Sequence, residues 1–224
     1  MSRLQTVTDR IETAAHSVGR RPEEIVLLAV SKKQPLARIE ALINDGQRRF
    51  GENYVDEALD KMAHFAAHDL EWHFIGPVQS NKTRALAEAF DWVQSVDRAK
   101  IVRRLNAQRP PDLAPLNILI QVNLDGEAQK AGCAPDALDT LAAEVAAAPR
   151  LILRGLMAIP AERSEPSEQQ AVFARLRALF EQLAARYPSV DTLSAGMSGD
   201  LEAAVAAGST MVRVGTDLFG PRPD

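Results

Sequence analysis

A lysine at the end of an apolar run is the residue whose position most suggests chemistry. The run LLAV at 27–30 is followed by Ser31, Lys32 and Lys33. An amine in a partly desolvated, partly cationic site has a lowered pKa and becomes a nucleophile toward aldehydes. Strand alternation would point Lys33 away, so Lys32 is the candidate. The alternative is a surface lysine whose stem covers apolar surface while its ammonium reaches water.

Two glycine-containing turns near the C-terminus suggest a phosphate site. GMSGD at 196–200 leads into a helical pattern, and Gly215, Thr216 and Asp217 follow the last apolar run. Such turns expose backbone N–H groups to an anion, and the hydroxyls of Ser198 and Thr216 can donate to phosphate oxygens. The alternative is that Ser198 and Thr216 simply cap two helices. Taken with Lys32, the turns point to a ligand that is both an aldehyde and a phosphate.

An arginine lies two residues before the second turn. Arg213 and Gly215 should share a strand face, which we expect to be the inner one. Arginine only donates hydrogen bonds and keeps its proton, so beside a pyridine ring it would leave the ring nitrogen unprotonated and the ring a poor electron sink. The alternative is a structural ion pair between Arg213 and a buried carboxylate such as Glu52.

The elements that must position these residues alternate along the whole chain. Short apolar or β-branched runs predict eight strands, at 25–30, 49–52, 71–76, 92–96, 116–123, 153–159, 192–195 and 211–215. Helical periodicity fills the intervals at 36–45, 54–67, 81–89, 97–108, 135–148, 168–186 and 201–207. This alternation predicts an α/β fold, a single TIM-type (β/α)₈ barrel over residues 1–224 with no appended β-domain. A doubly wound open sheet is the structural alternative.

The last predicted strand is followed by too little chain for a full covering helix. We expect the amphipathic N-terminal helix at 4–18 to cover that gap. In a parallel barrel the functional face is at the carboxyl ends of the strands, where Lys32 and both turns would meet.

Composition limits the partners. The net charge of −4 argues against nucleic acid and against an anionic membrane surface as the main partner. Cys133 is the only cysteine, so neither an intrachain disulfide nor a cysteine-based zinc site is possible.

The N-terminal segment lacks the apolar core of a signal peptide, and we expect a cytoplasmic monomer. His64 and His68 share a helix face, but no HExxH pattern accompanies them, and we expect no metal.

Long motifs of the chain resemble those of the pyridoxal phosphate homeostasis protein family, the single-domain relatives of the alanine racemase N-terminal barrel. The matching stretches are LLAVSK (27–32), FGENYVDEA (50–58), EWHFIGPVQSNK (71–82), RGLMAIP (154–160) and LSAGMSGDLEAAVAAGSTMVRVGTDLFGPR (193–222). They run nearly end to end. One departure is SKKQP at 31–35, where the family usually shows SKTKP. The first lysine is retained, and Lys33 is an extra amine beside it.

The resemblance implies a ligand and roles for its site. Pyridoxal 5′-phosphate (PLP) would be held as a Schiff base on Lys32, with Asn53 near its ring, Arg213 near its pyridine nitrogen, and a phosphate-binding group on the last two turns. That group is Ser198, Gly215 and Thr216. The implied function is intracellular PLP (vitamin B6) homeostasis without established turnover, with PLP-dependent apoenzymes as possible recipients.

Two enzymatic alternatives use the same lysine. One is a PLP-dependent amino-acid racemase or aldolase, and the other is a Schiff-base aldolase of phosphosugar type without cofactor. Two-base racemisation needs a second acid or base on the opposite face of the substrate. Tyr54 and Tyr187 are the only tyrosines, and we expect Tyr54 to have a packing role although it could approach the barrel mouth. The roles of His73, a core histidine or a cofactor neighbour, and of Lys130, in a polar loop that could be a lid, are left open.

Overall fold

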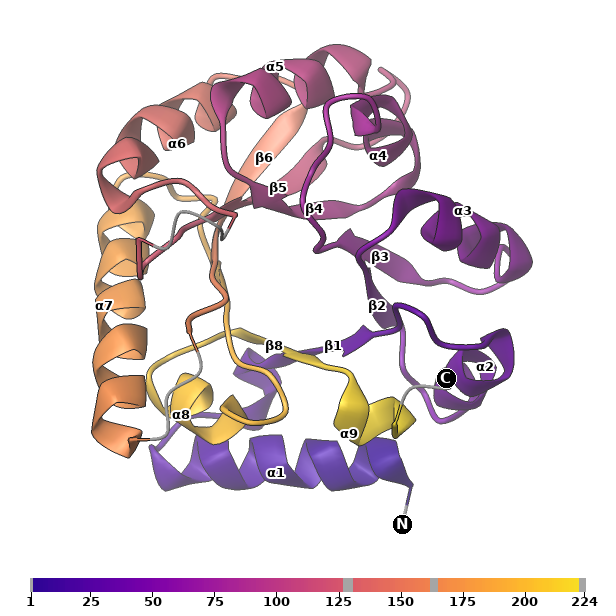
Figure 1. Cartoon of the computed structure of the whole chain (residues 1–224), viewed down its shortest axis with the longest axis vertical. Helices are drawn as coiled ribbons and strands as arrows, with labels where there is room; N and C mark the ends of the chain where they lie inside the picture. The colour runs from indigo at the N-terminus through magenta and orange to yellow at the C-terminus, as the bar shows by residue number, and fades with distance from the viewer. Residues whose placement is uncertain (1, 127–130, 162–164, 222–224) are drawn as a thin grey trace.

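The chain folds into a closed barrel of eight parallel strands surrounded by helices (Figure 1). The computed structural model describes residues 2–126, 131–161 and 165–221. The strands follow one another around the barrel in chain order, and β1 pairs in parallel with both β2 and β8. The closed pairing confirms the predicted TIM-type barrel and excludes the open, doubly wound sheet.

All eight predicted strands are present, with ends that shift by up to two residues. They are β1 (Val26–Val30), β2 (Arg49–Glu52), β3 (Glu71–Phe74), β4 (Trp92–Val96), β5 (Leu116–Gln121), β6 (Leu151–Met157), β7 (Thr192–Ser194) and β8 (Met211–Val214). Their short apolar runs suit strands that are buried on both faces. The strand predicted at 116–123 ends earlier, because the chain beyond it makes only an isolated bridge between Val122 and Cys133.

The helices fall close to their predicted positions. They are α1 (Arg3–Ser17), α2 (Leu36–Asn44), α3 (Val55–His64), α4 (Thr83–Ala89), α5 (Ala99–Gln108), α6 (Leu138–Ala146), α7 (Pro166–Ala184), α8 (Leu201–Ala206) and α9 (Thr216–Phe219), with 3₁₀ turns η1 (Pro22–Glu24) and η2 (Pro135–Ala137). None of these is long and apolar enough to cross a bilayer, within the described ranges.

The N-terminal helix covers the end of the barrel wall, as predicted. α9 is a single turn, and α1 runs along the outside of α8 and α9, contacting both (Figure 1). The first and last elements of the chain therefore lie together, close to the turns that the sequence singles out.

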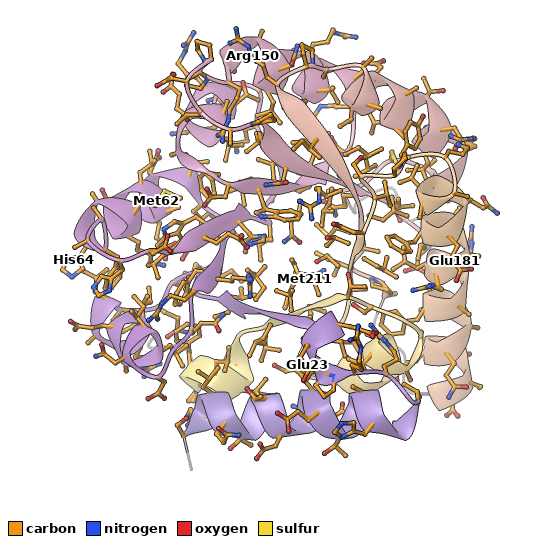
Figure 2. The ribbon with its side chains drawn as sticks, turned by 180° about the vertical axis from the view of Figure 1, so that it is seen from behind. Glu23, Met62, His64, Arg150, Glu181 and Met211 are labelled. Carbon is orange, nitrogen blue, oxygen red and sulfur yellow. The ribbon has the colours of Figure 1, made fainter. Side chains whose placement is uncertain are left out.

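The main hydrophobic core lies between the strands and the helices, and the barrel interior is filled by side chains of its own. Leu28, Ile75 and Met211 form one small interior cluster, and Trp92, Leu119 and Met157 form another. Figure 2 shows Met211 inside the ring of strands, whereas His64 and Glu181 lie on its outside. The interior also contains buried polar side chains, among them Arg213, His73 and Gln94.

Candidate functional site

One cavity of about 240 Å³ opens at the carboxyl ends of the strands. Its wall contains all six residues that the sequence singled out: Lys32, Asn53, Ser198, Arg213, Gly215 and Thr216. The remaining lining residues are Val30, Gln34, Ile75, Ile159, Met197, Gly199 and Gly220. The apolar members are Val30, Ile75, Ile159 and Met197, and the polar members come from β8 and from the turns after β1, β2, β7 and β8. Such a lining is typical of a small-molecule site.

The turn that carries Lys32 is held by a buried ion pair behind it. Lys61 on α3 is 3% exposed and donates from Nζ to the Ser31 carbonyl oxygen (2.7 Å), to Glu52 Oε1 (2.7 Å) and to Glu57 Oε1 (2.6 Å). The Ser31 hydroxyl donates to the same oxygen of Glu52. Burial raises the pKa of Glu52, against the opposing effect of Lys61 and Ser31. The residue before Lys32 is therefore fixed through both its backbone and its side chain.

The residue after Lys32 turns the chain away from the cavity. Lys33 has a φ of 57°, in the left-handed region that non-glycine residues rarely adopt, and its N–H donates to Glu57. Its ammonium lies 5.8 Å from the centre of the Tyr54 ring, outside the cavity lining. The expected separation of the two lysines is confirmed. Tyr54 is 49% exposed and does not line the cavity, so the packing expected of it is limited to a half-covered ring beside Lys33.

Asn53 lines the cavity and carries a buried polar atom without a partner. Its Oδ1 is buried and has no hydrogen-bond partner among the residues that the structure describes. The backbone of Asn53 approaches Gly76 so closely that a Cβ there would lie 2.2 Å from the Asn53 carbonyl oxygen. Glycine at 76 thus permits the position of Asn53. A buried amide oxygen without a hydrogen-bond donor is unfavourable, so Asn53 would gain from a donor brought to this part of the cavity wall.

The turn after β7 depends on a glycine and an internal hydrogen bond. Gly196 has a φ of +95°, and a Cβ on it would lie 2.5 Å from Ala204 Cβ, so the strand end can pack on α8 only without a side chain. Asp200 Oδ1 accepts from the Met197 N–H at 2.6 Å. The N-cap positions of α8 and α9 are Asp200 and Gly215. The alternative in which Ser198 and Thr216 cap these helices is therefore wrong, and both side chains belong to the cavity wall instead.

Arg10 on α1 fixes both turns from outside the barrel, a role that the sequence did not suggest. Its guanidinium donates to the Ser198 carbonyl oxygen (3.0 Å), to Glu202 (2.8 and 3.0 Å) and to Asp217 (2.5 Å). Hydrogen bonding to Glu202 is the largest cause of the raised pKa of Arg10. One side chain thus joins the starts of α8 and α9.

Arg213 reaches the cavity from inside the barrel. Its NH1 donates to Ser194 Oγ and its NH2 to the Ala158 carbonyl oxygen, each at 2.8 Å. Burial lowers its pKa to about 10, so the group still carries its charge at neutral pH. The predicted alternative, an ion pair with Glu52, is wrong because Glu52 pairs with Lys61.

Several other sequence candidates lie elsewhere. His73 is buried in the barrel interior below the cavity, with hydrogen bonds to Glu71 and Gln94, and is a satisfied core histidine. α3 ends at His64, so His68 does not share a helix face with it as expected, and both rings contact Phe65, which follows the helix. Within the described ranges, no group of three or more histidine, cysteine or acidic side chains could hold a metal ion. Lys130 lies outside the described residues.

Comparison with known proteins gives consistent matches over the whole chain. The alanine racemase N-terminal domain family matches residues 3–223. The chain is 56% identical over 222 residues to the pyridoxal phosphate homeostasis protein of Escherichia coli K12, covering 98% of this chain and 95% of that protein. Its counterpart of the same description in Pseudomonas aeruginosa is 55% identical over 219 residues, covering 98% and 94%. Among solved structures, PipY of Synechococcus elongatus with PLP bound is 37% identical, with a TM-score of 0.82, covering 96% of this chain and 100% of that one.

Proposed function

This chain belongs to the alanine racemase N-terminal domain family, and on that premise we propose that it binds PLP through Lys32 and serves PLP homeostasis without turning over amino acids. The observation that carries the proposal is the single cavity in which Lys32, Arg213 and the two glycine-containing turns meet. Its relatives support the same ligand: the Escherichia coli protein is described by PLP homeostasis, and PipY has been solved with PLP.

The residues of the cavity fit this ligand at both of its ends. The turns at 196–200 and 215–216 would hold the phosphate, as turns after the seventh and eighth strands of such barrels commonly do. Lys32 lies on the turn after β1, the strand that pairs with β8, and so enters the cavity wall beside the turn at 215–216. The buried Oδ1 of Asn53, without a partner in the described part of the chain, would accept from the ligand. PLP supplies an aldehyde carbon that a lysine amine can attack, and in enzymes a ring that accepts electrons.

The contact proposed between Arg213 and the ring nitrogen would make the ring of bound PLP a weak electron sink. A guanidinium whose pKa is about 10 donates a hydrogen bond to the ring nitrogen but does not transfer its proton at neutral pH. An unprotonated ring nitrogen stabilises a carbanion poorly. This favours holding the ligand over transforming amino acids on it.

The cavity wall also favours a non-catalytic role. Among its described lining residues, Lys32 and Arg213 are the only titratable side chains. Tyr54 and Tyr187 are not among them. A racemase acting through two bases needs a second group that can exchange a proton on the face opposite the lysine.

The absorption spectrum tests the binding proposal. We expect the purified chain, alone or after addition of PLP, to show the visible band of a lysine-bound aldehyde. Lys32→Arg keeps the positive charge but cannot form the bond, so it should lose the band. Lys33→Arg is the matched control, because that neighbouring ammonium lies outside the cavity, and it should keep the band. Absence of the band in the parent, or its survival in Lys32→Arg, would contradict the proposal.

Hydrogen exchange at Cα tests the absence of turnover. The PLP-loaded chain is incubated with a panel of L-amino acids in deuterated water, and deuterium incorporation is followed by mass spectrometry. We expect exchange no faster than with PLP alone. Sustained exchange that depends on Lys32 would instead favour a racemase or aldolase.

The recipients, the monomeric state and the cytoplasmic location remain predictions from the sequence. Within the proposal, PLP-dependent apoenzymes would take up the ligand that this chain releases.

A further inference from the structure

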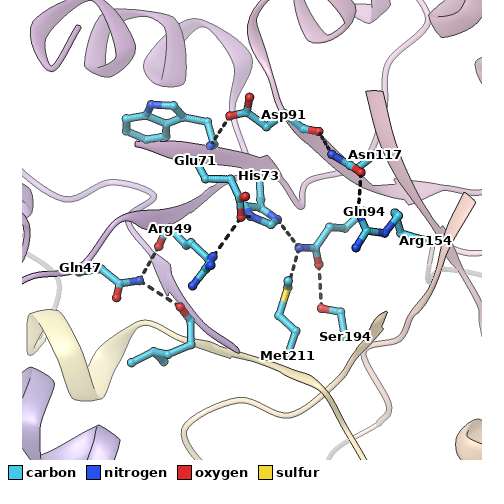
Figure 3. Close-up of polar contacts among 12 residues, drawn as sticks. Gln47, Arg49, Glu71, His73, Asp91, Gln94, Asn117, Arg154, Ser194 and Met211 are labelled. Atoms are coloured by element: carbon cyan, nitrogen blue, oxygen red, sulfur yellow. Dashed lines mark hydrogen bonds and ion pairs between the residues drawn. The ribbon is translucent and has the colours of Figure 1, made fainter. Parts of the chain in front are cut away.

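A continuous row of hydrogen bonds crosses the barrel interior from the cavity to the opposite end. It joins Arg213 to Ser194 (2.8 Å), Ser194 to Gln94 (2.7 Å), Gln94 to His73 (2.8 Å) and His73 to Glu71 (2.7 Å). Figure 3 shows its course from Ser194 through Gln94 and His73 to Glu71. Apart from Glu71, all of these side chains are buried.

The direction of the row is fixed by the groups at its two ends. Arginine can only donate, so Ser194 Oγ accepts from it, and the serine hydroxyl then donates to Gln94 Oε1. The amide nitrogen of Gln94 faces two acceptors, His73 Nδ1 and, at 3.1 Å, Met211 Sδ. A flipped amide would place its oxygen against the methionine sulfur, which offers no proton. The orientation of Gln94 is therefore determined by its neighbours.

The same logic fixes the proton of His73. The Glu71 carboxylate can only accept, so a neutral ring must carry its proton on Nε2, 2.7 Å away, and Nδ1 then accepts from Gln94. Burial lowers the pKa of His73, so the ring stays neutral near pH 7. Each group thus donates to the next, from a buried cation to a carboxylate. Such an aligned chain polarises every member in the same sense.

The far end of the row lies in a polar hollow at the amino ends of the strands. Glu71 is the first residue of β3, its side chain is 37% exposed, and Arg49 lies 3.2 Å from its carboxylate. Asp69, Asp91 and Asn117 also line the hollow. Burial opposes ionisation of Glu71, but His73 and Arg49 outweigh it and lower its pKa. Glu71 is therefore an anion at neutral pH.

We propose that Glu71, His73, Gln94 and Ser194 are positioning residues that hold Arg213 in the orientation needed for the ligand. The inference rests on the proposed function for its ligand, PLP. Glu71 selects the ring tautomer, the tautomer sets the amide of Gln94, the amide aligns the serine hydroxyl, and that hydroxyl holds one arm of the guanidinium. The Ala158 carbonyl oxygen holds the other arm. A change of Glu71, at the amino ends of the strands, therefore alters how Arg213 is held in the cavity at their carboxyl ends.

The first test needs no ligand. Nitrogen-15 NMR of the parent chain, with the His73 signals assigned by their loss in His73→Gln, reports the ring tautomer directly. The expected result is a neutral ring protonated on Nε2 at pH 7. A ring protonated on Nδ1, or a charged ring at that pH, would overturn the proposal.

The second test measures PLP affinity in Glu71→Gln, with Asp69→Asn as the matched control. Asp69 is an exposed carboxylate in the same hollow and has no part in the row. We expect Glu71→Gln to weaken PLP binding by about three- to tenfold, in the range of coupling through packed networks, and Asp69→Asn by less than about twofold. If the two variants weaken PLP binding equally, the loss of a negative charge in the hollow explains both effects, and the proposal is overturned.

A double-variant cycle separates coupling through the row from a local effect. In a Gln94→Leu background the row is broken midway, so Glu71→Gln should change the affinity by less than about 1.5-fold. An undiminished effect there would overturn the proposal. Ser194→Ala should weaken binding and Ser194→Thr, which keeps the hydroxyl, should restore it. If the parent binds no PLP, the proposed function fails, and so does the role of the row in it, whereas the NMR result still reports whether the row exists.

Discussion

Removing Lys61 should destabilise the folded chain by an amount that depends on pH. In Lys61→Met the fully buried Glu52 loses its only cationic partner in the described structure, while Met fills the space of the lysine stem. One oxygen of Glu52 already lacks a hydrogen-bond partner among the described residues, so little remains to stabilise the carboxylate. The easiest relaxation is for Glu52 to take up a proton.

The free energy needed to protonate Glu52 sets the size of the expected destabilisation. Protonating a carboxyl whose ordinary pKa is 4.5 costs about 1.4 kcal/mol for each pH unit above that value. At pH 7 this amounts to about 3.4 kcal/mol, which falls within the usual cost of breaking a buried ion pair. At pH 5 it falls to about 0.7 kcal/mol. We therefore expect the destabilisation to shrink by at most about 2–3 kcal/mol between pH 7 and pH 5, because the raised pKa of Glu52 gives the parent part of the same pH dependence.

Urea unfolding of the parent and the variant at both pH values measures this difference. The control is Lys61→Met with Glu52→Gln, which removes the charge that needs neutralising and should recover much of the stability at pH 7. A loss below about 1 kcal/mol, or one of the same size at pH 5 and pH 7, would refute the reasoning. Because Lys61 also holds the Ser31 carbonyl oxygen, the single variant should bind PLP more weakly as well.

Three further outcomes follow from single side chains. Burial lowers the pKa of His73, so below about pH 6.5 the unfolded chain takes up a proton that the folded chain does not, and stability falls by up to about 1.4 kcal/mol per pH unit. His73→Gln should flatten this slope in urea unfolding between pH 7.5 and 5.5, and an unchanged slope would contradict the assignment. Burial raises the pKa of Cys133 to about 11, so its thiol should react with iodoacetamide at pH 8 only after unfolding. Rapid labelling of the folded chain would contradict it. Arg10→Gln should weaken PLP binding about threefold or more by loosening both phosphate turns, whereas the exposed Arg21→Gln should not. If the two variants bind PLP with equal affinity, Arg10 does not support the phosphate turns.

The fold could be predicted because its signals are local. Each strand is a short apolar run and each helix has its own periodicity, so their alternation already implies parallel strands and a barrel. The candidate site followed from one rule, that the carboxyl ends of barrel strands form the functional face. This rule brought Lys32, Ser198 and Thr216 together from opposite ends of the sequence, and the structure places them around one cavity.

The supporting residues could not be predicted, because their roles depend on side-chain distances across the barrel. Arg10 reads as an ordinary polar residue of an amphipathic helix until α1 is seen to lie against α8 and α9. Lys61 reads as a surface lysine, and the sequence suggested Arg213 as the partner of the buried carboxylate Glu52. Gln94 and Ser194 gave no signal at all, since buried amides and hydroxyls reveal themselves only through their partners.

The central claim is a covalent bond between PLP and one particular amine. Borohydride reduction of the PLP-loaded chain, followed by proteolysis and fragment-ion mass spectrometry, locates that bond to a single residue. We expect a pyridoxyl phosphate group on Lys32. Its attachment to the adjacent Lys33 or to another lysine, or recovery of an unmodified Lys32 from fully loaded protein, would show that Lys32 does not hold PLP.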